Sequence, residues 1–220
     1  MSLSLYGSQG FEVGACWTIL GGGMSILQGQ GSPFRSSSMS RMPIPSVEEA
    51  PEASRALLAK ANERLGRVPN LYRIVANSPA ALEALVTFHG ALEKGDLDPL
   101  TRERIALAVA EANGCDYCLS AQTYRVRAGH LPDDVEITAN RNGASNDIRA
   151  NAAVCFAAKL ARGRGEVTDA DFAAVKEAGY SDAEIVEIIA HVAVNVFAGT
   201  ANIALQTDID FPRIGARNAT

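Results

Sequence analysis

Apolar residues recur along most of the chain at helical spacing, and no stretch alternates convincingly with the two-residue period of a strand. Ser78-Pro79 and Asp98-Pro99 each place a capping side chain before a proline, which is the residue order of a helix start. The pattern predicts an all-α fold, a compact domain of about eight helices joined by short turns. The helical stretches, short ones included, are residues 51–65, 69–76, 79–95, 99–113, 116–128, 132–141, 146–162, 168–178 and 181–206.

The last helical stretch is the most apolar one. It opens with a capping box, Ser181 followed by Glu184. Its apolar residues cover more than one face, so we expect it to be buried nearly all round. Such a helix lies at the centre of a domain or in a subunit interface, and on that ground we expect a homo-oligomer.

The first 42 residues differ from the rest. Glycine and serine recur there without helical or strand periodicity, which predicts a flexible tail ahead of a helical domain over residues 43–213. Residues 15–27 are fairly apolar, but Glu12 precedes them and no Lys or Arg does, unlike a secretory signal. No apolar run is seen to reach the roughly 18 residues of a membrane helix. The sequence therefore predicts a cytoplasmic protein without a membrane segment.

Composition changes this picture little. Hydrophobic residues make up 47% of the chain and aromatic residues 6%, a balance that favours packed helices. The net charge of −5 is spread along the chain, and Lys and Arg form no stripe. This argues against a nucleic-acid-binding function.

Cys115 and Cys118 are the residues most indicative of chemistry. They follow Gly114 at the predicted start of a helix, where the helix dipole lowers a thiol pKa and favours a nucleophilic thiolate. A thiolate attacks a peroxide to become a sulfenic acid, and a second thiol then condenses with it to a disulfide. The pair therefore points to redox chemistry.

Two other interpretations of this pair remain open. The cysteines are small enough to be buried packing residues, and a zinc site is the other alternative. Zinc usually takes four ligands, and neither Cys16, Cys155 nor a histidine supplies a second pair at finger-like spacing. No metal is expected. No cofactor is implied either, because no glycine-rich phosphate loop follows a strand.

Two more residues belong to the expected site. Glu103 lies on the preceding helix, which a reversal at Gly114 would bring back toward the thiols. Gln122 follows Cys118 by four residues and shares its helix face. Glutamine can donate a hydrogen bond or orient a water, but it does not accept a proton at neutral pH.

The chain resembles the carboxymuconolactone decarboxylase superfamily, and within it the alkyl hydroperoxidase D branch, often described as peroxidase-related. The resemblance covers about residues 43–212. The segments that carry it are Leu100-Thr101-Arg102-Glu103-Arg104, Glu111-Ala112-Asn113-Gly114-Cys115-Asp116-Tyr117-Cys118-Leu119-Ser120-Ala121, Ile189-Ala190-His191-Val192-Ala193-Val194-Asn195-Val196-Phe197 and Asp208-Ile209-Asp210-Phe211-Pro212.

That branch carries a Glu, then eleven residues, then a CxxC, then three residues and a His. By this resemblance Glu103 belongs to a proton relay, Cys118 becomes the sulfenic acid, and Cys115 is its resolving partner and proton donor. Gln122 stands at the family's histidine position, which implies a less ionised Cys118 and slower turnover. The resemblance also implies a helical domain, a trimer or hexamer, a small hydroperoxide substrate, and a thiol reductant or reducing protein.

The leading hypothesis is thus a thiol-dependent hydroperoxidase of the peroxiredoxin type, an oxidoreductase acting on peroxide. One alternative is a non-redox lactone decarboxylase-like enzyme, which needs no CxxC. Another is a redox-sensing oligomeric protein with weak catalysis, because Gln122 replaces the family histidine.

Of the remaining polar residues, the histidines are the ones that could replace that base. His191 is interpreted as a core or interface residue and is the first candidate, ahead of His89 and His130. Cys155 is expected to be a buried hydrophobe and Glu111 a solvated acid. No chemistry is assigned to two amides in the last helix, Asn195 and Asn202.

Overall fold

The structure, a computed structural model, describes residues 40–129 and 134–217. The predicted tail over residues 1–42 therefore lies outside the described residues except for 40–42, and His130 lies outside them too. Residues 40 and 41 are bound near the end of the last helix. The Ser40 hydroxyl accepts a hydrogen bond from Asp208 N–H, and Arg41 N–H donates to Leu205 O.

The described residues form nine helices and no strand, which confirms the predicted all-α class. The helices are α1 (Glu52–Leu65), α2 (Asn70–Val75), α3 (Pro79–Leu92), α4 (Pro99–Ala112), α5 (Asp116–Gly129), α6 (Asp134–Arg141), α7 (Ile148–Arg162), α8 (Asp169–Glu177) and α9 (Asp182–Leu205).

Local chemistry sets most of the helix starts. The Ser78, Asp98 and Ser181 side chains accept hydrogen bonds from the backbone N–H three residues on, as the sequence pattern predicted. Proline follows the first two of these caps and fits the first helical position. The α3 helix ends at Leu92, a few residues before its predicted end near Gly95.

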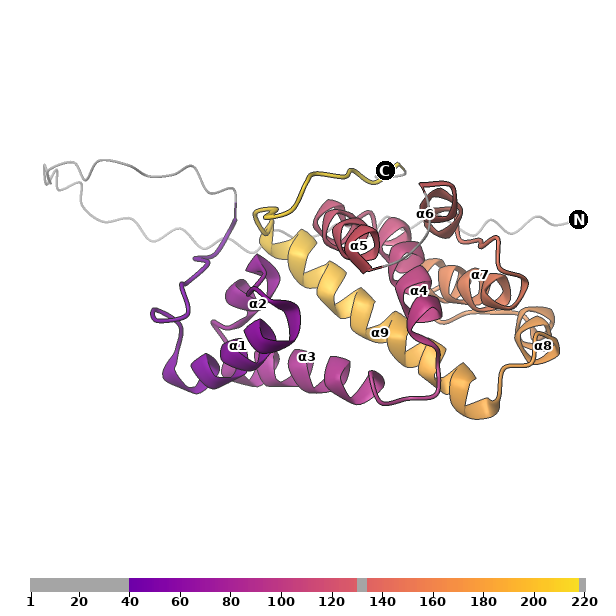
Figure 1. Ribbon diagram of the computed structural model, residues 1–220, viewed down its shortest axis with the longest axis horizontal. Helices are drawn as coiled ribbons and strands as arrows, with labels where there is room; N and C mark the ends of the chain where they lie inside the picture. The colour runs from indigo at the N-terminus through magenta and orange to yellow at the C-terminus, as the bar shows by residue number, and fades with distance from the viewer. Residues whose placement is uncertain (1–39, 130–133, 218–220) are drawn as a thin grey trace, which may run out of the picture. The chain divides into compact units, whose positions relative to one another are not determined.

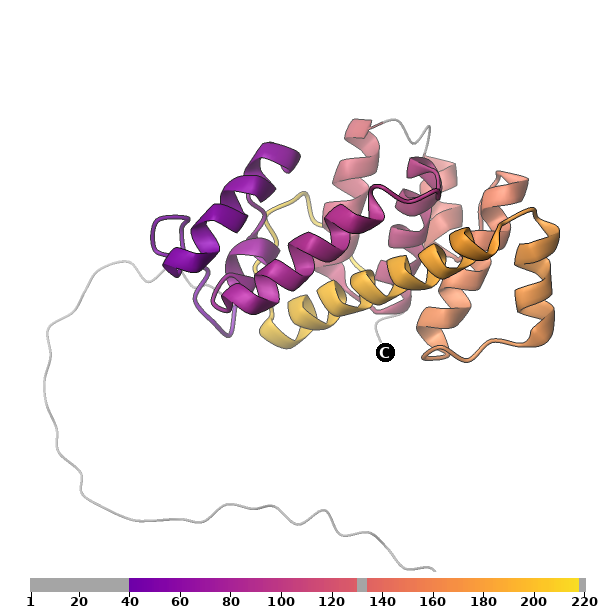
Figure 2. The same cartoon turned by 90° about the horizontal axis from the view of Figure 1, so that it is seen from below.

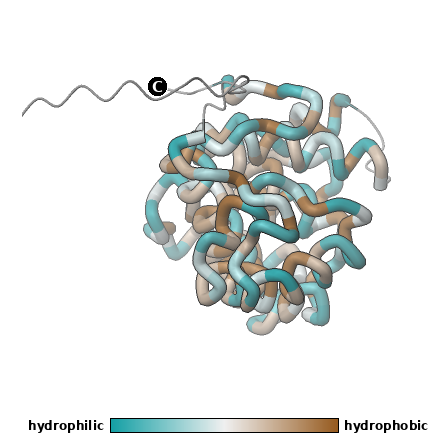
Figure 3. Tube along the Cα trace, turned by 90° about the vertical axis from the view of Figure 1, so that its left-hand side faces the viewer, coloured by the Kyte–Doolittle hydropathy of each residue, from teal (hydrophilic) through white to brown (hydrophobic). Residues whose placement is uncertain are grey.

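The α4 helix is central to the packing, because it contacts α5, α6, α7 and α9. Helices α1, α2 and α3 pack together, and α9 runs alongside both groups, as Figures 1 and 2 show. One apolar cluster joins α1–α3 to the start of α5 and the end of α9, and a second joins α4, α7, α8 and α9. In Figure 3 hydrophobic and hydrophilic residues alternate along the helices. The cysteine pair lies in the first cluster.

The expectation that α9 is buried nearly all round is wrong for the described chain. Its apolar residues Val186 and Ile203 are 64% and 49% exposed, and Ile189 and Phe197 are 43% exposed. One face of α9 packs against α2, α3, α4, α5 and α7, whereas these residues stay outside that packing. Among the described helices, α9 is also long and apolar enough to cross a membrane by length and composition, a property that the sequence reading missed.

Candidate active site

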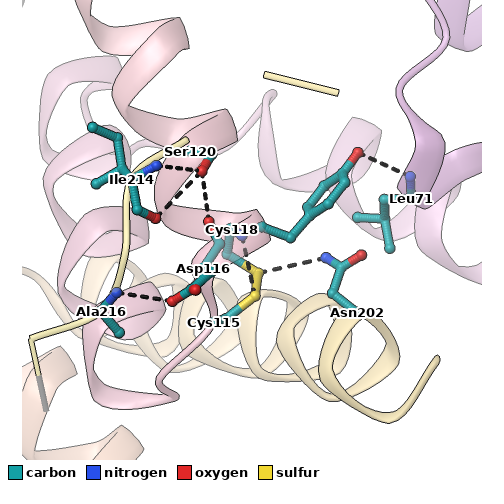
Figure 4. The surroundings of a disulfide bond; sticks show 9 residues. Leu71, Cys115, Asp116, Cys118, Ser120, Asn202, Ile214 and Ala216 are labelled. Atoms are coloured by element: carbon teal, nitrogen blue, oxygen red, sulfur yellow. Dashed lines mark hydrogen bonds between the residues drawn. A yellow bond between two sulfur atoms is a disulfide. The ribbon is translucent and has the colours of Figure 1, made fainter. Parts of the chain in front are cut away.

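The two cysteines lie where α4 turns into α5. Gly114 has a φ of 65°, the left-handed conformation that glycine adopts most readily, and the chain reverses there. Cys115 directly precedes α5 and is joined to Cys118 by a disulfide with a Cα–Cα distance of 5.2 Å (Figure 4). The Cys118 N–H donates to Cys115 Sγ at 3.1 Å. Both sulfurs therefore lie at the positive end of a helix, among N–H groups that stabilise a thiolate.

The two sulfurs differ in accessibility. Cys115 is 1% exposed and belongs to the apolar core, whereas Cys118 is partly exposed. Cys118 lines a cavity of about 290 Å³, here called the thiol cavity. Much of the cavity wall is aromatic or aliphatic, and three arginines also line it. The aromatic and aliphatic residues are Leu65, Pro69, Leu71, Tyr72, Tyr117, Ala121, Tyr124, Ala198 and Phe211, and the arginines are Arg64, Arg67 and Arg125. A small apolar molecule entering this cavity would meet Cys118.

Glu103 lies in a different cavity. Its Oε2 accepts hydrogen bonds from Arg125 Nη2 at 2.6 Å and Arg125 Nε at 3.1 Å. It lines a cavity of about 230 Å³, here called the acid cavity, together with Gln122 and His191. The structure thus does not place Glu103 beside Cys118. Gln122 lines both cavities and lies between the two predicted site residues.

Both described histidines face these cavities in the neutral state. Burial, followed by the charges of Arg64 and Arg125, lowers the pKa of His89 to about 3. Burial and the nearby Arg102 lower the pKa of His191 to about 4. His89 lines both cavities, whereas His191 lines the acid cavity. His191 is 7% exposed, as expected for a core histidine.

Asn202 on α9 is a site residue that the sequence reading missed. Its Nδ2 lies 3.5 Å from Cys118 Sγ, and Figure 4 shows the amide pointing toward the sulfurs. A donor in this position favours negative charge on Cys118. The only available signal was an amide interrupting an apolar helix, which does not reveal its partner. The other such amide, Asn195, donates to the backbone oxygen of His191.

The segment of residues 208–217 is bound to the start of α5. Ser120 Oγ accepts a hydrogen bond from Ile214 N–H at 2.9 Å, and Asp116 Oδ1 accepts one from Ala216 N–H at 2.9 Å (Figure 4). Tyr117 lies between the two cysteines in the sequence, and its hydroxyl donates a hydrogen bond to Asp210 Oδ1 at 2.8 Å. We call this stretch the C-terminal strap. It holds Phe211 against the thiol cavity.

Tyr117 is also held from the other side. Its hydroxyl accepts a hydrogen bond from Leu71 N–H at 3.0 Å, so the residue bridges α2 and the strap. Burial and the adjacent Asp210 raise the pKa of Tyr117 above its usual value. The phenol therefore stays protonated and remains a hydrogen-bond donor to Asp210.

The exposure of two residues, Glu111 and Cys155, differs from what the sequence predicted. Glu111 is 4% exposed instead of solvated, and its Oε2 pairs with Arg141 Nε at 2.6 Å. A buried carboxylate needs such a partner. Cys155 is partly exposed instead of buried, with its Sγ 3.7 Å from Asn151 Oδ1. No group of three or more His, Cys, Asp or Glu side chains suited to a metal occurs among residues 40–129 and 134–217.

Comparison with known proteins places this geometry in context. The model of the carboxymuconolactone decarboxylase family matches residues 79–159, which include the cysteine pair. The alkylhydroperoxidase AhpD core of a peroxidase-related protein from Ralstonia eutropha JMP134 is 27% identical, with a TM-score of 0.68 over 80% of this chain and 94% of its own. A peroxidase-related protein from Silicibacter sp. TM1040 is 25% identical, with a TM-score of 0.67 over 80% and 95% of the two chains.

A third solved structure shows the same fold in a different setting. It is a cysteine variant of the debrominase Bmp8 in complex with 2,3,4-tribromopyrrole, 19% identical, with a TM-score of 0.67 over 79% of this chain and 94% of its own. At this identity the likeness concerns the fold alone. No curated protein matches the sequence significantly.

Proposed function

Because the chain belongs to the carboxymuconolactone decarboxylase superfamily, in its alkyl hydroperoxidase D-like branch, we propose that it is a thiol-dependent hydroperoxidase. The observation that carries the proposal is the bridged Cys115–Cys118 pair at a helix start, with Cys118 open to a cavity. Fold alone does not select a reaction, because a debrominase shares it. The arrangement of the two sulfurs is what supports a hydroperoxidase.

The proposed cycle balances in three steps. The Cys118 thiolate attacks a hydroperoxide, the O–O bond breaks, and Cys118 becomes a sulfenic acid while the leaving oxygen takes a proton and departs as an alcohol or water. The Cys115 thiol then condenses with the sulfenic acid, which forms the disulfide and releases water. Two thiols of a reductant, or one dithiol protein, restore the pair by exchange and are themselves oxidised.

The two cysteines are assigned their roles by accessibility and hydrogen bonding. Cys118 is the partly exposed sulfur and has Asn202 Nδ2 beside it, which supports its role as the attacking thiolate. Cys115 is buried and accepts the Cys118 N–H, which supports its role as the resolving thiol. Glu103 and Gln122 remain proposed members of the proton relay. Continuous turnover needs a supply of thiol reductant, which agrees with the expected cytoplasmic location.

Peroxide consumption in the presence of excess dithiothreitol tests the proposal. We expect Cys118→Ser to abolish turnover. Cys115→Ser, reduced and then freed of dithiothreitol, should stop after one oxidation and leave a sulfenic acid that dimedone traps. Cys155→Ser is the matched control, because this partly exposed thiol lies outside the thiol cavity, and it should keep the parent rate.

The result that would refute a hydroperoxidase is a Cys118→Ser variant that consumes peroxide as fast as the parent. A parent that forms the disulfide once, but does not turn over with reductant present, would instead indicate a redox sensor.

A further inference from the structure

The thiol cavity and the acid cavity share part of their walls. The residues that line both are His89, Gln122, Arg125 and Asn195. Two of these come from helices far apart in sequence, since His89 lies on α3 and Gln122 on α5. Cys118 lies on one side of this shared wall and Glu103 on the other, so a proton passing between them must cross it.

Two residues that line the acid cavity each have a buried polar atom that no part of the described chain satisfies. His191 Nε2 and Gln122 Oε1 are both buried and have no hydrogen-bond partner among the described residues. A buried polar atom without a partner is uncommon, and next to a cavity it marks a place where a water or a substrate oxygen would complete the hydrogen bonding after a small side-chain movement. His191 is 7% exposed and is the more deeply buried of the two described histidines.

An amide cannot complete this path, because it neither gains nor loses a proton at neutral pH. A neutral imidazole can, because one ring nitrogen accepts a proton while the other donates one. We propose that His89 and His191 form the proton-transfer link between Cys118 and Glu103 that Gln122 does not provide. The inference rests on the hydroperoxidase function proposed above.

The two histidines have different tasks in this scheme. His89 lines the thiol cavity, where it passes on the proton that Cys118 loses on becoming the attacking thiolate: one ring nitrogen accepts this proton while the other releases one, so the ring stays neutral overall. One proton leaves Cys118 and one proton reaches the leaving oxygen, so the histidines carry no net charge after the step. His191 acts through His89, which lines the acid cavity with it, and is a positioning residue that connects the path to Glu103.

Burial, and after it the positive charges around the pair, keep both rings neutral. His89 faces Arg64 and Arg125, and His191 faces Arg102, Arg125 and the opposing carboxylate of Glu187. Two further carboxylates, Glu93 and Glu103, line the acid cavity. With the pKa values of His89 and His191 near 3 and 4, neither ring is charged at neutral pH, and each keeps a free acceptor nitrogen.

The test is the second-order rate of Cys118 oxidation by hydrogen peroxide, followed by stopped-flow on the reduced full chain between pH 5 and 9. We expect His89→Asn to lower this rate about tenfold or more, within the usual range for removing a proton-transfer group. His191→Asn should lower it less and alter its pH profile. Glu177→Gln, an exposed position on α8 outside both cavities, is the control and should leave both unchanged.

Rescue separates proton transfer from a structural effect. Gln122→His restores an imidazole one turn after Cys118, so in this background His89→Asn should lower the rate less than threefold. This comparison holds even if a substitution at the buried His191 unfolds the protein. The relay is overturned if His89→Asn keeps the parent rate and pH profile, or if its loss is equally large in both backgrounds. A parent that does not turn over peroxide would instead refute the underlying hydroperoxidase function.

Discussion

At the scale of single residues, Tyr117 connects the cysteine pair to the rest of the fold. Its hydroxyl bridges Leu71 N–H and Asp210 Oδ1, and its ring packs edge-on against Phe211. We expect Tyr117→Phe to lower the free energy of unfolding by about 1–3 kcal/mol, because it leaves buried hydrogen-bonding groups unpaired. Urea denaturation of the reduced protein measures this.

Tyr124→Phe is the matched control for that experiment. Its ring also contacts Phe211, but Tyr124 is 48% exposed. We expect a change within about 0.5 kcal/mol, as for most surface substitutions. Equal effects of the two variants would show that the Tyr117 hydroxyl does not stabilise the fold.

The sequence predicted some residue positions and missed others for a physical reason. The placement of both thiols at a helix start followed from Gly114 and local spacing, and the structure has them there. Asn202 lies 84 positions from Cys118, and its proximity depends on how α9 crosses α5. Spacing within one helix carries no information about that crossing. The separation of Glu103 from the thiol cavity could not be predicted either, because it too depends on how helices pack.

At the scale of the element, α9 has an exposed apolar stripe that includes Val186, Ile189 and Phe197. We expect this stripe to be covered in a homo-oligomer, since exposed apolar patches of this kind commonly mark protein contacts. Phe197→Glu should therefore lower the mass measured by light scattering after size-exclusion chromatography. A charge placed in an apolar interface has no partner and opposes association.

Ile148→Glu provides the comparison for α9. Ile148 is 93% exposed at the start of α7, so a charge there should leave the mass unchanged. If Phe197→Glu keeps the parent mass, this stripe is not the contact.

The start of a helix was easier to predict from the sequence than which of its faces are buried. Capping residues and prolines are local signals, so the start of α3 at Pro79 and that of α4 at Pro99 could be inferred from a few neighbouring residues. Which faces of α9 are covered depends on α2, α3, α4, α5 and α7, and this information is not local. A helix apolar all round was expected to be buried all round, but its described partners cover only one side.

At the scale of the whole molecule, the two neutral histidines couple stability to pH. Their pKa values of about 3 for His89 and about 4 for His191 in the folded state lie below the 6.5 of an unfolded chain. Between about pH 6.5 and 4 the unfolded chain binds more protons, so the free energy of unfolding decreases as the pH falls through this window. At about 1.4 kcal/mol per pH unit for each group, the loss across this window is at most about 3 kcal/mol per histidine.

Urea unfolding at pH 7.5, 6.5, 5.5 and 4.5 measures this dependence. The variant carrying both His89→Asn and His191→Asn should lose much of the slope above pH 5. Below that, carboxylates with lowered pKa values, such as Glu136 and Glu184, add their own loss as they become protonated. An identical slope in parent and variant between pH 7.5 and 5.5 would exclude the histidines as its source.

The C-terminal strap is synthesised after the residues that it binds at the start of α5. Residues 208–217 supply the N–H groups that bind Asp116 and Ser120, and they bring Asp210 to Tyr117. A ribosome makes these residues long after the two cysteines, and domains fold as their parts emerge. The growing chain therefore carries both thiols before the contacts of the strap with Asp116, Tyr117 and Ser120 can form, so we expect the start of α5 to be less firmly held until the last segment arrives.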